Sequence, residues 1–164
     1  MGLASAKALA WSLDIPLVGA SSLETLASSG DLPPGFIAPT MDARRDEVYG
    51  ALFRRGPDGG LDRCLEDCVM APERWAASLA EQVGDAAVTL VGRGASRYRR
   101  LLGDSLGERL LEPAGGLERS PSPLSLASLA RRHLAAAKTI HPALAAPNYL
   151  RSHGARPPAS VKGL

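Results

Sequence analysis

Apolar and polar positions alternate in a way that predicts a hairpin followed by further strands. Residues 36–42 and 47–53 are rich in β-forming side chains and are joined by the polar segment 43–46, which is typical of a β-hairpin. Residues 61–70 are a candidate for the next strand. The continuous apolar run 87–91 has the length and composition of a strand covered on both faces. Two shorter strands are predicted at residues 16–20 and 109–112.

Helical patterns fall between these strands. Pro72 opens a predicted helix in which Trp75, Leu79 and Val83 recur every four residues on one face until Gly84 ends it. Further helices are predicted at residues 2–13, 22–29, 96–102 and from 122 onward, and in the last one Leu126, Leu129, Ala130, Leu134 and Ala137 share an apolar face. Strands alternating with helices, together with one antiparallel hairpin, predict a mixed α/β sheet.

Bulk composition narrows the class of protein. A length of 164 residues suits one domain or two small lobes. A net charge of +2 gives no case for an extended nucleic-acid or membrane surface. Two cysteines are too few for a disulfide scaffold, and we expect reduced thiols, no leader, no membrane span and a cytoplasmic protein.

The turn after the buried strand is a weak candidate for a cofactor site. Gly92 and Gly94 would let backbone amides approach a phosphate at a helix start. No third glycine follows and no Walker lysine is present, so a plain structural turn is favoured. We predict no cofactor held by this chain on its own.

Motifs for metal binding or nucleophilic catalysis are not found. Cys64 and Cys68 lack a second ligand pair, and His133, His141 and His153 do not have zincin spacing. No Gly-x-Ser-x-Gly elbow occurs. We therefore assign no catalytic residue and no metal ligand.

A basic cluster raises a separate hypothesis of RNA binding. It consists of Arg93, Arg97, Tyr98, Arg99 and Arg100. Guanidinium groups beside an aromatic ring can hold a phosphate backbone or stack a base. A solvated helix face is the favoured interpretation, since short charge runs usually carry no function.

Four stretches, in order and over nearly the whole chain, resemble the TsaB (YeaZ) family of bacterial tRNA threonylcarbamoyladenosine biosynthesis. They are residues 2–10, residues 15–24, the segment Met41-Asp42-Ala43-Arg44-Arg45-Asp46-Glu47-Val48-Tyr49, and Pro147-Asn148-Tyr149-Leu150-Arg151. The Asp-Ala-Arg-Arg turn ending in Glu-Val-Tyr is the most specific of them, and the family usually has Gly where Asp46 stands.

The resemblance implies an actin-like, sugar-kinase-like (ASKHA) fold and the role of a non-catalytic scaffold. In that role the protein binds the catalytic TsaD-type subunit, a TsaE-type ATPase joins, ATP can sit at the partner interface, and tRNA is contacted indirectly. Homodimers are an alternative assembly. The implied interface is the first helix, with Ala4, Lys7, Ala8 and Trp11, and the implied motif residues are Asp42, Arg44, Arg45, Glu47, Tyr49, Tyr149, Leu150 and Arg151. The alternative function is an enzyme of the same superfold, either a threonylcarbamoyl transferase or a glycoprotease-like peptidase.

The chain departs from the family at its start. Members begin with a strand, a hairpin, a long helix and a glycine-rich loop, whereas Met1 aligns inside the helix that follows these elements. We therefore expect an incomplete first lobe at residues 1–30, a second lobe at 31–152, and a disordered tail at 153–164. Sheet edges and helix faces that lose their neighbours favour self-association of the chain as written; a monodisperse, cooperatively melting monomer in sedimentation and thermal unfolding would contradict this expectation.

Overall fold

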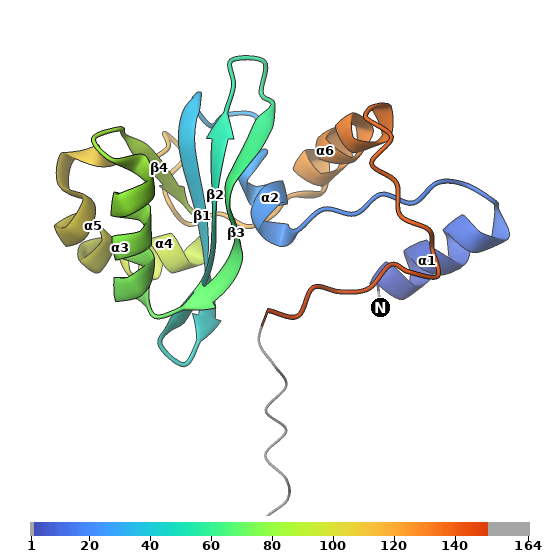
Figure 1. Cartoon of the computed structure of the whole chain (residues 1–164), viewed down its shortest axis with the longest axis horizontal. Coiled ribbons are helices and arrows are strands. Elements are labelled where there is room, and N and C mark those ends of the chain that lie inside the picture. The colour runs from blue at the N-terminus through green and yellow to red at the C-terminus, as the bar shows by residue number, and fades with distance from the viewer. Residues whose placement is uncertain (1, 151–164) are drawn as a thin grey trace, which may run out of the picture.

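The computed structural model describes residues 2–150, and its centre is a five-stranded sheet of order β3-β2-β1-β4-β5 (Figure 1). β1 (Gly35–Arg44), β2 (Glu47–Arg55) and β3 (Leu61–Met70) form an antiparallel meander. β4 (Val88–Val91) and the short β5 (Leu110–Leu111) add to β1 in parallel. The predicted hairpin, the strand at 61–70 and the mixed sheet are confirmed.

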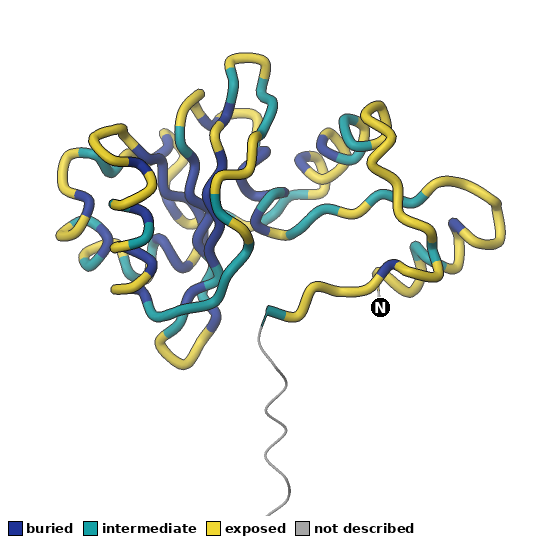
Figure 2. The backbone as a smooth tube through the Cα atoms, viewed as in Figure 1, coloured by how far each residue is buried: buried dark blue, intermediate teal, exposed yellow. Residues whose placement is uncertain are grey.

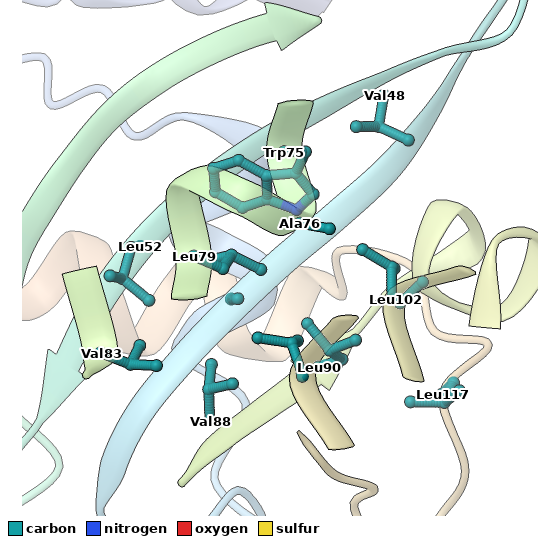
Figure 3. Close-up of a cluster of buried hydrophobic side chains, with 13 residues drawn as sticks. Val48, Leu52, Trp75, Ala76, Leu79, Val83, Val88, Leu90, Leu102 and Leu117 are labelled. Carbon is teal, nitrogen blue, oxygen red and sulfur yellow. The ribbon is translucent and has the colours of Figure 1, made fainter. Parts of the chain in front are cut away.

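One face of the sheet is covered by three helices. These are α3 (Pro72–Val83), α4 (Arg93–Arg97) and α5 (Arg99–Leu106). The predicted stripe of α3 is confirmed, because Trp75, Leu79 and Val83 are all buried. Figure 3 shows them packing with strand side chains and with Leu102 and Leu117 in one apolar cluster. The predicted single helix at residues 96–102 is wrong: two helices meet at Tyr98, whose ψ of 22° departs from helical geometry.

The indole of Trp75 fixes the position of α3 on the sheet. A Cβ on Gly50 of β2 would lie 2.7 Å from the indole ring, so this position must be glycine for the ring to lie flat on the strand. The indole Nε1–H donates to Oγ1 of the buried Thr40 at 2.9 Å. The polar N–H of this buried ring therefore has a hydrogen-bond acceptor.

The opposite face of the sheet is covered by α2 (Ser22–Ala27), with α6 (Pro123–Ala135) beside it. The predicted cap is confirmed, since the Ser21 hydroxyl accepts from the Glu24 amide at 3.0 Å. Leu23, Leu26 and Ala27 form a second apolar cluster with side chains of the sheet.

The predicted apolar face of α6 is wrong. Leu129 is buried, but Leu126 and Leu134 are exposed, and Ala137 lies beyond the helix with a φ of 53°. Instead, α6 is held by polar contacts: Nη1 of Arg132 donates to the Gly59 carbonyl at 2.6 Å, and Ser125 is buried near Ser28. Its leucines therefore contribute less burial than their spacing indicates.

Helix α1 (Gly2–Ser12) lies apart from the sheet, as Figures 1 and 2 show. The predicted strand at residues 16–20 is wrong: this segment forms one isolated bridge between Leu17 and Ile140. Pro16 has no amide to donate, which limits regular pairing there. The strand predicted at 109–112 is shorter than expected, at Leu110–Leu111.

Thr40→Val should destabilise the protein by about 1–3 kcal/mol, because it leaves the buried indole N–H of Trp75 without an acceptor. Urea unfolding measures the effect. Thr40→Ser keeps the hydroxyl and is the matched control. Equal stability of the two variants would show that the hydrogen bond contributes nothing.

Candidate functional site

Helix α1 is apolar around most of its circumference. Ser5, Lys7 and Ser12 are its polar residues, so it has no continuous polar face. Helices of this kind are normally buried on all sides. Here Ala10 is buried against the rest of the chain, while Leu9 is 58% and Trp11 is 65% exposed.

The predicted interface residues of α1 divide between two sides. Ala4, Ala8 and Trp11 are exposed and follow the spacing of one helix face. The ammonium of Lys7 instead turns toward the C-terminal segment and donates to the Ala145 carbonyl at 2.7 Å. An open face of small side chains with one tryptophan at its end is thus presented to solvent.

The segments that hold α1 leave a groove of about 830 Å³ facing α2 and β3. Leu3, Leu17 and Ile140 supply apolar walls, and Asn148 and Leu150 of the last resemblance stretch, residues 147–151, line it as well. Tyr149 is exposed, and Arg151 lies outside the described residues. The groove therefore lies where α1 and the C-terminal segment meet the sheet domain.

A charged network closes one side of this groove. His133 lies between two acceptors, with Nδ1 at 3.2 Å from the Gly19 carbonyl and Nε2 at 3.1 Å from Oε1 of Glu24. Glu24 also pairs with Arg63 at 3.8 Å. The His133 ring therefore contacts both the segment before α2 and α2 itself. It ties the segment before α2 to α6.

The hairpin motif forms a strained tip. Arg44 pairs with Glu47, which leaves Arg45 and Asp46 as a two-residue turn. Arg44, Arg45 and Asp46 have φ values of 60°, 53° and 56°. Left-handed backbone costs an L-residue about 1–2 kcal/mol, and glycine or asparagine usually occupies such turns. Asp46 is where the resemblance expects glycine, and the geometry supplies the reason.

Other motif residues support this tip. The Asp42 carboxylate accepts from the Arg44 amide at 2.8 Å and from Nη1 of Arg97 at 3.3 Å. Asp46 lies 3.8 Å from Nη2 of Arg97. Tyr49 packs beside the second apolar cluster and lines the groove. Arg97 therefore ties α4 to the tip.

Close packing accounts for both glycines of the predicted phosphate turn. A Cβ at Gly92 would lie 2.4 Å from the Thr40 carbonyl oxygen, and one at Gly94 would lie 2.7 Å from the Met41 carbonyl carbon. The Gly92 amide already donates to the Leu117 carbonyl at 2.7 Å. The favoured interpretation of a plain structural turn, with no cofactor held by this chain on its own, stays a prediction.

The arginines of the basic cluster are largely paired within the chain. Arg93 pairs with Glu118 at 3.5 Å, and Nε of Arg99 lies 2.6 Å from Glu112. Arg97 is engaged at the hairpin, and its guanidinium lies 5.4 Å from the Tyr98 ring centroid. Of this cluster, Arg100 shows no ion pair among the described residues.

Metal and thiol chemistry have little support among residues 2–150. No group of three or more His, Cys, Asp or Glu side chains suited to a metal is found there. Cys64 is exposed, and burial raises the pKa of the Cys68 thiol, which keeps it protonated at neutral pH. No helix in that range has both the length and the apolar character to cross a bilayer.

Comparisons with known proteins agree with this architecture. The sequence model of the family described as "TsaD: tRNA N6-adenosine threonylcarbamoyltransferase" matches residues 1–159. The tRNA threonylcarbamoyladenosine biosynthesis protein TsaB of Bacillus subtilis is 36% identical over 151 residues, which are 92% of this chain and 62% of that protein.

Two solved structures from Pseudomonas aeruginosa share the fold. A protein with similarity to the peptidase YEAZ superposes with a TM-score of 0.76 at 24% identity, covering 92% of this chain and 66% of its own. YeaZ superposes with a TM-score of 0.71 at 25% identity, covering 90% of this chain and 66% of its own. The chain thus spans less than two thirds of the length of these relatives.

The sheet order and the helices on both faces define an α/β protein of the actin-like, sugar-kinase-like class, as expected. Within that class, the chain belongs to the TsaD family and stands with its TsaB (YeaZ) members.

Asp46→Val should lower stability by about 1–2 kcal/mol, since a β-branched side chain tolerates left-handed backbone poorly. Asp46→Gly should leave stability equal or higher. Chemical denaturation measures both variants. Arg54→Val, at an exposed position of β2 without positive φ, should be nearly neutral. If Asp46→Val were as stable as Asp46→Gly, the tip would not be strained.

Proposed function

We propose that this chain is a non-catalytic partner in tRNA threonylcarbamoyladenosine biosynthesis and that it binds a TsaD-type catalytic subunit through α1. The name and 36% identity of the Bacillus subtilis relative support the pathway. The exposed apolar surface of α1 supports the mode of action.

The main support for this proposal is that the exposed surface of α1 consists mostly of small or apolar side chains. Ala4 and Ala8 allow a second helix backbone to approach closely, and Trp11 at the end of that face offers a large anchor. Exposed apolar surface of this kind marks a protein interaction site. A helix from a partner subunit is the occupant that fits it.

In this function the chain contributes a surface and no reacting group. The catalytic subunit carries the transfer to adenosine, a TsaE-type ATPase joins the assembly, and ATP binds at the partner interface. In this assembly the catalytic subunit contacts the tRNA, so this chain contacts it indirectly. A homodimer through the same α1 face is the competing assembly in solution.

The alternative is an enzyme of the same superfold. It is favoured by the matching family description, which is that of the transferase itself. Purified chain that transfers threonylcarbamoyl or cleaves a glycoprotein without a second subunit would establish it.

Ala8→Arg should weaken binding to the TsaD-type subunit at least about tenfold, because a long cation would be buried at the helix contact. Isothermal titration calorimetry measures the change, and circular dichroism checks the fold.

Ala77→Arg is the matched control, since Ala77 is also an exposed alanine in a helix, but in α3 on the sheet domain. It should bind as the unaltered chain does. Equal loss in both variants, or no loss in either, would contradict an interface on α1.

A further inference from the structure

We propose that the tip of the β1–β2 hairpin, together with the adjacent hollow on α4 and α5, binds the phosphate backbone of RNA directly. This inference rests on the proposed function in so far as that function brings an RNA to the assembly. It goes further, because it gives this chain its own contact with the nucleic acid.

The first observation is the choice of residues at the tip. Arg44 and Arg45 both have left-handed backbone, which glycine or asparagine adopts more readily. Local strain of this kind is found where a side chain is needed for function. Two arginines at consecutive, exposed positions of a turn are suited to phosphate, with which arginine makes paired hydrogen bonds.

The second observation is that these guanidinium groups are available. The structure shows no side-chain hydrogen bond or ion pair for Arg44 or Arg45 within residues 2–150, and both residues are exposed. The end of the β1–β2 hairpin is drawn as exposed in Figure 2. The nearby carboxylates of Asp42 and Asp46 are both engaged by Arg97. These two carboxylates therefore contact α4, while the side chains of Arg44 and Arg45 are exposed.

The third observation comes from the hollow next to Arg97. It has a volume of about 450 Å³ and is lined by Arg97, Tyr98, Arg100, Leu101, Asp104 and Ser105. Because Arg97 is paired with Asp42 and Asp46, Arg100 is the arginine of this hollow that has no ion pair among the described residues. The hydroxyl of Tyr98 is buried and makes no hydrogen bond within the described residues. A buried hydroxyl without a partner is unfavourable, and a phosphate oxygen beside Arg97 and Arg100 would accept a hydrogen bond from it.

Arg97 joins the two parts into one surface, since it contacts the carboxylates of Asp42 and Asp46 and lines the hollow. Arginines interleaved with an aromatic ring are typical of surfaces that bind the backbone and bases of single-stranded RNA. The chain as a whole carries a net charge of only +2, so the contact is local and weak on its own.

The test is a salt titration of RNA binding with the full chain. The probe is a fluorescently labelled, unmodified tRNA transcript, and the variant is Arg44→Asn with Arg45→Asn. Asparagine tolerates positive φ, so the turn is kept while two charges are lost. Arg54→Gln with Arg74→Gln is the control, because it removes the same charge from exposed positions on β2 and α3.

We expect the hairpin variant to bind tRNA about tenfold more weakly, with a log–log salt slope less steep by about 1.5, as two lost phosphate contacts require. The control should bind as the unaltered chain does. Tyr98→Phe should weaken binding about threefold with thermal stability kept or raised. Unchanged affinity and slope in the hairpin variant, or no tRNA binding by the unaltered chain, would overturn the proposal.

Further arms identify the source of the phosphate and separate this proposal from the preceding one. If ATP or inorganic phosphate competed for the site as strongly as unlabelled tRNA does, the site would be one for a small anion. If the hairpin variant lost binding to polyglutamate but kept its binding to tRNA, the site would be one for an acidic protein. Either result would overturn the RNA site. The hairpin variant should still bind the TsaD-type subunit. If the subunit fails to bind the unaltered chain while the salt slope changes as expected, the proposed function fails and the RNA site stands.

Discussion

Burial of both faces of β1 is the constraint on which the sheet domain depends. Its consecutive residues Ile37 and Ala38 are each 0% exposed and belong to the two opposite apolar clusters. Because β1 pairs with a strand on each edge, both of its faces can be buried only if helices pack on both sides of the sheet. Helix α3 therefore packs on one side through Trp75, and α2 packs on the other.

Helix α1 stands outside this arrangement. The sheet domain completes its two apolar clusters without α1, which is held instead by Lys7, by the edge-on contact of Trp11 with His141 and by the bridge at Leu17. These are few contacts for a helix that is apolar on most sides. The free energy still available from covering it is the physical basis for a partner at this surface.

Local patterns in the sequence predicted the elements that are held by contacts close in the sequence or that are fully buried. The repeat of Trp75, Leu79 and Val83 and the run at β4 led directly to buried positions, because their surroundings are apolar on the face that the pattern marks. Leu126 and Leu134 show the limit of the method. Their spacing is as regular, but burial depends on what lies opposite, and a helix pattern does not contain that information.

The site shows a similar division. The motif from Asp42 to Tyr49 could be located from its residues, and the hairpin connection predicted at residues 43–46 contains the three consecutive residues with positive φ. The link from Arg97 to Asp42 and the position of His133 between Gly19 and Glu24 could not be found, since these contacts join residues 55 to 114 positions apart. Lys7 was expected at the partner surface with Ala4 and Ala8, yet its ammonium contacts the C-terminal segment.

Hydrogen–deuterium exchange of the chain with and without a TsaD-type subunit tests the central claim most directly. The account predicts that amides of α1 become strongly protected in the mixture while those of the sheet keep their rates. Protection that appears on α3 or α5, with α1 exchanging as fast as in the chain alone, would contradict it.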